Sequence, residues 1–503
     1  MGYNAHNGPL SVASRNAASQ ELKNSSFFAL LRELKLPPLL ARVLAPVILI
    51  IATPVLSGLS ETTAETTQPL RQGEHVVKAG EKPKSGSVKS RVLNKDFEFA
   101  YHQEQAGISS NPGAVNVFSG TGKLGRILGF GKDSGVRLGG VWIGNADILM
   151  SGGTKPGSVT FNSLFIADLQ LDLDMLQGVP GAAVGASFLQ FDGQNSNGSA
   201  GVLTGYNALT QAPPLNRSEL YELWWRQALM DKHLIIRFGK TLPTVDFNNV
   251  IQALQVENET PYIPQITGLL FSPIFANASI LGVIPGYYNS AWGLTVTAIP
   301  DPSYYFSYGI YDGSLANGRQ TGTYAFPSFN SYYFTIGEAG YSWAGESPGK
   351  IAVGGWGQSG TLVHGNTQES GAQGFYAFAN HRLQTLNLGN RSGAVIGYLQ
   401  YGFNNSKTMM ANQFVGAGLT GFNLIENRPK DSIGVGIAVS WLNNPPESQS
   451  NEIITQVYYQ AHLFGDIFFQ PTFSYVPNPG VKTPANGAYP SATSMIFQLT
   501  ALF

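Results

Sequence analysis

The chain has 503 residues, of which 43% are hydrophobic and only 12% are charged, and its formal net charge is −1 with no cysteine. The charged fraction is about half that of an ordinary globular protein. Near neutrality removes the basic face that nucleic acid needs, and the lack of cysteine excludes a disulfide framework. Beyond the amino-terminal segment, no stretch reaches the roughly 18 to 20 apolar residues of a spanning helix, so a helical membrane protein is excluded.

The first predicted element is a secretory signal peptide. Residues 43–56 are apolar, are preceded by basic residues ending at Arg42, and are followed by small residues at 57–60. A positive flank, an apolar core and a small-residue exit are typical of such a signal. The alternative, a single anchoring helix, is disfavoured by the short stretch and its two prolines. We therefore assign residues 1–60 to a leader and signal peptide.

Residues 61–125 are polar and rich in Gly, Ser, Lys and Pro. We predict an irregular periplasmic extension there, with a plug as a minor alternative. From about residue 126 the pattern changes to short alternating segments separated by turn residues.

Alternation with a period of two continues through the body of the chain. In residues 161–174, Phe161 and Leu169 belong to the apolar face, while Asn162, Asp168, Gln170, Asp172 and Asp174 share the polar one. In residues 220–229 the apolar face is Tyr221, Leu223, Trp225 and Leu229, which leaves Glu222, Trp224 and Arg226 on the other. The segments 292–298, 433–441 and 452–463 repeat this scheme. A period of two puts the two sets on opposite faces of a strand.

The last strand, residues 492–503, has the same pattern and ends in an aromatic residue. Met495, Phe497, Leu499, Ala501 and Phe503 alternate with Ser494, Gln498 and Thr500. Such a strand is expected to close an outer-membrane barrel.

Segments of about ten residues with this alternation are typical of a transmembrane β-barrel, which satisfies every backbone group in lipid. Dividing the residues after 126 by about 23 per strand and loop gives about 16 strands, and single-chain bacterial barrels have even numbers. We predict an all-β fold: a transmembrane antiparallel barrel of 16 strands over residues 126–503. A barrel of this size leaves an aqueous channel.

Three blocks of the chain resemble the carbohydrate-selective porins of the OprB type. They are residues 135–142, residues 463–480, and a central block made of residues 219–229, 231–240 and Asp246-Phe247. The resemblance covers residues 126–503 in the family's order. It implies an outer-membrane channel for passive uptake of sugars, often glucose or related monosaccharides.

The resemblance also implies a constriction lined by basic, acidic and aromatic side chains. Glu222, Trp224, Arg226 and Arg237 fall in the central block on the predicted lumen face, and Asp168 and Asp172 share that face. Sugar hydroxyls accept hydrogen bonds from Arg and donate to carboxylates, and the C–H face of a pyranose rests on an aromatic ring. The alternative is a structural pairing of Arg226 and Arg237 with Glu222, Asp168 or Asp172 on adjacent strands.

Enzymatic motifs fail on inspection, and we predict no catalytic residue, metal or cofactor. Asp172 and Asp174 could suggest a glycosidase pair, but two residues apart on one strand face they are expected to line the lumen. Gly345-Glu-Ser347-Pro-Gly349 resembles a nucleophile elbow, but Pro348 lacks the N–H that an oxyanion hole needs. Gly416-Ala-Gly418-Leu-Thr-Gly421 precedes no amphipathic helix and fits a barrel wall instead.

The alternation lapses between residues 241 and 284, where four prolines interrupt an apolar stretch. A long loop here could fold into the pore and narrow it, or could remain an external loop or a short crossover.

The predicted partners are small sugars and outer-membrane lipid, with no nucleic acid, in a monomer or homotrimer. Alternative functions are a barrel that exports or docks a polysaccharide, and a channel for polyols or sugar acids.

Overall fold

The computed structural model describes residues 122–131, 134–210, 216–248, 250, 276–286, 288–301, 303–318, 327–343, 347–389, 392–429, 431–443 and 448–503. The predicted signal peptide, nearly all of the predicted extension, and the centre of the 241–284 segment lie outside these residues.

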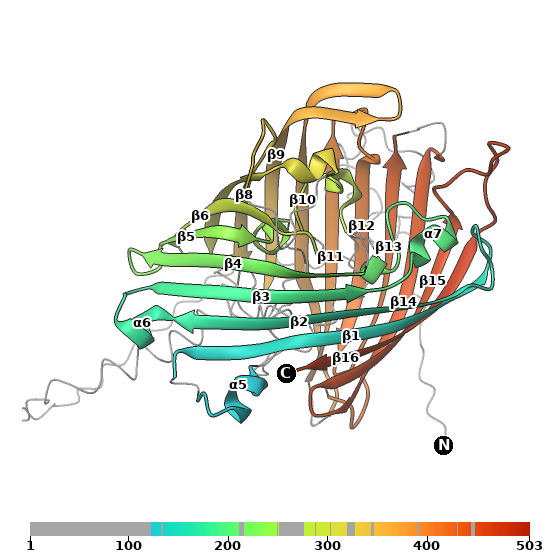
Figure 1. The fold of residues 1–503 in the computed structure, drawn as a ribbon. Coiled ribbons are helices and arrows are strands. Elements are labelled where there is room, and N and C mark those ends of the chain that lie inside the picture. The colour runs from blue at the N-terminus through green and yellow to red at the C-terminus, as the bar shows by residue number, and fades with distance from the viewer. Residues whose placement is uncertain are drawn as a thin grey trace, which may run out of the picture. The chain divides into compact units, whose positions relative to one another are not determined.

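The described residues form one closed antiparallel barrel of 16 strands, in which each strand pairs with its neighbours in the sequence and β16 pairs with β1 (Figure 1). The strands are β1 (Val136–Ser151), β2 (Val159–Asp172), β3 (Ala182–Asp192), β4 (Arg217–Leu229), β5 (Leu234–Thr241), β6 (Ala291–Asp301), β7 (Tyr304–Asp312), β8 (Tyr333–Trp343), β9 (Gly349–His364), β10 (Thr367–Asn387), β11 (Ser392–Asn404), β12 (Ala411–Phe422), β13 (Ser432–Leu442), β14 (Asn451–Phe464), β15 (Ile467–Asn478) and β16 (Ala492–Leu502). The predicted fold and strand number are confirmed.

Short helical turns occupy the connections. They are α5 (Lys123–Ile127), α6 (Leu173–Gln177), α7 (Ser196–Ala200), α8 (Pro243–Asp246), η2 (Ala208–Thr210), η3 (Ala278–Ile280) and η4 (Ser314–Asn317). Among the described helices, none is both long and apolar enough to cross a membrane.

The predicted alternation matches the burial of the strands. On β13, Ile433 and Val435 are each 43% exposed on the outer wall, while Gly434 and Gly436 face inward and are buried. On β2, Phe161 and Leu169 are exposed, and Asn162, Asp168 and Gln170 are buried. The glycines of Gly416-Ala-Gly418-Leu-Thr-Gly421 lie within β12, as expected of a barrel wall.

The seam of the barrel depends on a glycine. The Gly140 N–H donates to the Phe503 carbonyl (2.9 Å), and the Phe503 N–H donates to the Gly140 carbonyl (3.0 Å). A Cβ on Gly140 would lie 2.8 Å from the Phe503 ring, so only glycine lets this ring rest on β1. The ring also stacks on Phe165 of β2, with centroids 5.7 Å apart. The closing role predicted for the last strand is therefore confirmed.

Two details of the alternation were predicted wrongly. Tyr221 was expected on the outer wall but is fully buried. Ser187 pairs with Glu222 while Phe188 pairs with Leu220, so Tyr221 is the extra residue of a β-bulge. Asp174 does not continue the lumen face, because β2 ends at Asp172, whose side chain caps α6 by accepting the N–H groups of Asp174 and Met175.

Candidate functional site

The connection between β5 and β6 turns into the barrel at its described residues 242–248, 250, 276–286 and 288–290, which we call the crossing segment. Its Asn248 N–H donates to Glu338 Oε2 on β8 (2.6 Å), and its Ser279 carbonyl accepts from Asn404 Nδ2 on β11 (2.7 Å). It then returns to β4, where Arg217 Nη2 donates to the Tyr288 carbonyl. Strands β4 and β11 are seven positions apart in the sixteen-strand order, so the segment passes from one side of the lumen to the other.

These contacts favour the infolded-loop alternative for the described flanks of the crossing segment. Asn380 Nδ2 on β10 also donates to the Val250 carbonyl (3.3 Å), which places the first flank against the inner wall. Residues 251–275, at the centre of the connection, lie outside the described residues.

The connection between β3 and β4 also turns inward, and its described residues 193–210 are called the lining segment. Asn207 Nδ2 donates to Asp147 Oδ2 on β1 (3.0 Å), and Gln456 Nε2 on β14 donates to the Tyr206 carbonyl (2.8 Å). Leu203 N–H donates to Glu452 Oε2, also on β14 (2.8 Å). The lining segment therefore runs along the inner wall from β1 to β14.

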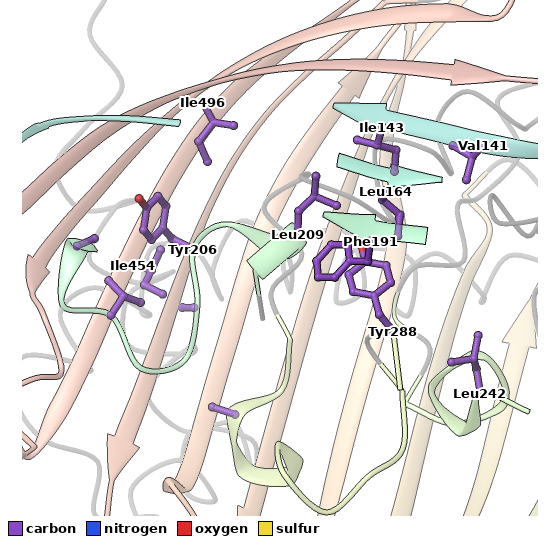
Figure 2. Close-up of a cluster of buried hydrophobic side chains, with 14 of the residues drawn as sticks. Val141, Ile143, Leu164, Phe191, Tyr206, Leu209, Leu242, Tyr288, Ile454 and Ile496 are labelled. Carbon is purple, nitrogen blue, oxygen red and sulfur yellow. The ribbon is translucent and has the colours of Figure 1, made fainter. Parts of the chain in front are cut away.

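An apolar cluster lies beneath the lining segment (Figure 2). Tyr206 and Leu209 of this segment are buried in it. The wall contributes Val141, Ile143, Leu164, Phe191, Ile454 and Ile496. These are inward-facing apolar residues, which an open aqueous lumen would not favour. The lining segment packs in the same cluster, and Tyr288 of the crossing segment stacks on Phe191.

A dense set of charges occupies the inner face of β4 and β5. Arg217 Nε lies 3.2 Å from Glu219 Oε1, and Lys240 Nζ lies 4.0 Å from Glu219 Oε2. Lys240 Nζ also donates to the Leu220 carbonyl (2.6 Å). Glu219 and Lys240 therefore belong to the same network as Arg217. Neither residue was among the predicted site residues.

Arg237 forms an ion pair with Asp246 at the end of α8, where the crossing segment begins. Thr295 Oγ1 on β6 donates to Asp246 Oδ2 (3.2 Å) and hydrogen-bonds to the Tyr311 hydroxyl on β7. Burial raises the pKa of the Asp246 carboxyl, and the Arg237 guanidinium opposes that rise. Arg237 thus binds the crossing segment to the wall.

The predicted residues Trp224, Arg226 and Arg237 are brought together on neighbouring strands. Arg226 is the direct cross-strand partner of Arg237, and the Arg237 guanidinium carbon lies 6.0 Å from the Trp224 ring centroid. Trp224 packs against Gly185 of β3, where an added Cβ would be 2.2 Å from the ring. This arrangement sets an aromatic ring beside the Arg237 guanidinium, with Arg226 opposite Arg237 on the neighbouring strand.

The predicted carboxylates take positions in two cross-strand rows. Asp168 and Glu222 both pair with Ser187 of β3, and Asp172 and Arg226 both pair with Ala183. Asp168 accepts a hydrogen bond from Gln170 Nε2 (2.8 Å). One oxygen of Asp172 caps α6 by accepting the N–H groups of Asp174 and Met175. This contact helps to fix the position of the Asp172 side chain.

The ion-pair partner of Arg237, Asp246, was not among the carboxylates that the sequence suggested, although the suggested Glu222 also interacts electrostatically with Arg237. Asp246 was noted only as part of the family-like central block, because strand alternation says nothing about a residue that a loop carries back to the wall. Among the described residues, no group of three or more His, Cys, Asp or Glu could hold a metal ion.

A family model described as carbohydrate-selective porin, OprB family, matches residues 165–491, more than half of the chain. The chain belongs to the OprB family of carbohydrate-selective porins. It is therefore a sugar-selective channel of the bacterial outer membrane, and its family and fold are those of channels rather than enzymes.

Solved structures share the porin's barrel. The high-pH structure of Pseudomonas putida OprB is 17% identical, with a TM-score of 0.60, covering 76% of this chain and 96% of that one. The low-pH structure of the same protein is 15% identical, with a TM-score of 0.48, covering 76% of this chain and 96% of that one. An anion-selective porin from Comamonas acidovorans is 10% identical, with a TM-score of 0.43, covering 73% of this chain and 99% of that one. No curated protein matches the porin.

Proposed function

We propose that this porin admits neutral monosaccharides, such as glucose, to the periplasm, and that they pass the constriction against Trp224, Arg226 and Arg237. The observation that carries the proposal is the packing of the Trp224 ring against Gly185, next to the Arg237 guanidinium. The C–H face of a pyranose can rest on the ring while its hydroxyls accept hydrogen bonds from the arginines.

The balance of charge favours a neutral solute. Strands β2 to β5 and α8 present four basic side chains and five acidic ones to the lumen. They are Arg217, Arg226, Arg237, Lys240, Asp168, Asp172, Glu219, Glu222 and Asp246. A set with both signs interleaved offers donors and acceptors to hydroxyls without a strong field for either ion sign. Weak contacts of this kind also allow the solute to leave.

Liposome swelling tests the proposal with glucose, a disaccharide, a polyol, a sugar acid and an amino acid of similar size. We expect glucose to enter faster than the size-matched solutes, and Trp224→Ala and Arg226→Ala to remove that preference. Trp142→Ala is the matched control, because Trp142 also lies over a glycine, Gly144, but on the outer wall. Equal entry of all small solutes in the unmodified porin would overturn the proposal in favour of a general porin, and preferred entry of the polyol or sugar acid would reassign the solute.

We also propose that residues 1–60 are removed on export and that residues 61–125 form an irregular periplasmic extension before the barrel domain of residues 126–503. The charge pattern around residues 43–56 supports the signal. The intact mass of protein purified from outer membranes tests the cleavage, and chemical crosslinking in the same membranes distinguishes a monomer from a homotrimer.

A further inference from the structure

Three consecutive residues of the crossing segment, Asp246, Phe247 and Asn248, are each held by a different part of the inner wall. Asp246 contacts Arg237 and Thr295, as described above. The Phe247 ring is fully buried over β7, where a Cβ on Gly309 would lie 2.9 Å from it. The Asn248 N–H donates to Glu338 Oε2 on β8. The tripeptide therefore enters the wall at three adjacent points.

Glu338 receives this tripeptide with neutral hydrogen-bond donors on both of its oxygens. Its Oε1 accepts from the Tyr305 hydroxyl (2.5 Å), and its Oε2 accepts from the Tyr376 hydroxyl (2.7 Å) as well as from Asn248 (2.6 Å). The side chain is buried. Hydrogen bonds to an ionised carboxylate are about twice as strong as those between neutral groups. Glu338 thus joins β7, β8 and β10 to the crossing segment at one point.

Two glycines make room for the tyrosines. A Cβ on Gly340 would lie 2.0 Å from the Tyr305 ring, and one on Gly354 would lie 2.3 Å from the Tyr376 ring. Both rings therefore lie against these glycines, and both hydroxyls donate to Glu338. Lys350 supports the same arrangement, because its Nζ lies 5.1 Å from the Tyr305 ring centroid and 4.7 Å from that of Phe378.

The backbone of the crossing segment is shaped to fit. Asn248 has a φ of 52°, in the left-handed region, where asparagine is several-fold enriched among residues other than glycine. This conformation follows directly after the buried Phe247 and redirects the chain beyond the Asn248 N–H, which donates to the carboxylate. The sequence thus supplies an aromatic anchor and then a residue suited to the turn.

We propose that Glu338, with Tyr305 and Tyr376, is a docking site for Asp246-Phe247-Asn248, and that Glu338 is the positioning residue that keeps the crossing segment in the lumen. The site binds a segment of its own chain rather than a solute. It therefore sets the bore of the channel for every small solute and ion, whichever sugar the constriction prefers.

Single-channel conductance in planar lipid bilayers with KCl tests the proposal on Glu338→Ala, Glu338→Gln and Gly354→Ala, the last of which displaces Tyr376. We expect a second, higher conductance level whose occupancy rises about ten-fold in Glu338→Ala, equivalent to about 1.4 kcal/mol. Glu338→Gln should show a smaller rise, because its amide oxygen still accepts hydrogen bonds. Conductance is measured channel by channel, so a smaller folded fraction cannot imitate this result.

Glu369→Gln is the matched control. Glu369 on β10 also accepts from backbone N–H groups and hydroxyls, but it holds the β11–β12 connection through Lys407 N (2.9 Å) and Thr408 N (3.2 Å). The conductance of Glu369→Gln channels should equal that of the unmodified porin. Unchanged conductance in Glu338→Ala channels, or an equal change in Glu369→Gln, would overturn the proposal. If neither Glu338 variant inserts, Gly354→Ala decides the matter by the same criterion. Because KCl carries the current, this outcome is separate from the sugar preference measured by swelling.

Discussion

The two inward-turning connections of this porin differ in charge: the lining segment has no charged residue, whereas the crossing segment carries Asp246 near its start. The lining segment rests on an apolar floor, in which Leu209 is fully buried among residues such as Ile143 and Leu164. The crossing segment is tied by the Arg237–Asp246 ion pair and by the Glu338 carboxylate. An apolar floor excludes water over a broad area, whereas charged ties act at single points. The crossing segment also has buried apolar residues in the same cluster, such as Leu242 and Tyr288, but its ion pair is a tie that a single substitution can remove.

The largest expected effect comes from breaking the Arg237–Asp246 pair. Asp246→Ala leaves a buried guanidinium without its carboxylate, which costs about 3 to 5 kcal/mol. We expect hydrogen exchange at residues 242–248 to accelerate strongly, with little change at residues 193–210. The double variant Arg237→Met with Asp246→Leu should recover part of the protection. Equal acceleration in both segments would show that the two connections are not independent.

Truncating the apolar floor should act on the other segment. Leu209→Ala removes a fully buried side chain and is expected to cost about 2 to 5 kcal/mol. Exchange should then accelerate at residues 193–210 and remain slow at residues 242–248. The outward-facing Leu223→Ala is a control, since its side chain is 39% exposed on the outer wall. A response confined to the crossing segment would contradict the assignment of Leu209.

A smaller effect is expected at the aromatic face of the constriction. Gly185→Ala places a methyl group 2.2 Å from the Trp224 ring, and relieving such overpacking costs about 1 to 3 kcal/mol. We expect the ring to lift from β3, reducing glucose entry in the swelling assay. Gly357→Ala serves for comparison, because its Cβ would meet only an ordinary contact at 3.4 Å. Unaltered glucose entry would mean that Trp224 does not line the path.

Salt should produce the smallest difference. Raising ionic strength from 0.1 M to 1 M shortens the Debye length from about 10 Å to about 3 Å, but buried pairs are screened much less than exposed ones. Exchange at residues 242–248 should therefore rise modestly, and exchange at residues 193–210 should not. A larger response in the lining segment would reverse the comparison.

Strand alternation predicted the wall well because lipid imposes it on every strand. The outer residues of β13 and β14 and the closing strand follow that rule. The rule failed at Tyr221, since a bulge depends on the geometry of two strands together. It also could not pair Arg237 with Asp246, because that contact joins a strand to a returning loop.

The sequence also contains a signal that indicates the lining segment. Leu164 and Ile166 interrupt the polar face of β2, and Ile496 interrupts that of β16. An apolar side chain facing a water-filled lumen is unfavourable unless something covers it. Apolar exceptions on the inner face therefore indicate an infolded segment, and here the lining segment packs in the same cluster as Leu164 and Ile496.

Because of the glycines beneath the inward aromatic rings, single mutations can change the lumen of this channel. Trp224, Tyr305, Tyr376 and Tyr458 each pack against a glycine, at positions 185, 340, 354 and 434. A glycine codon becomes an alanine codon by one base change, and the added methyl would raise an entire ring toward the axis. Single mutations can thus change the size selectivity of such a channel without changing the charge of its lumen.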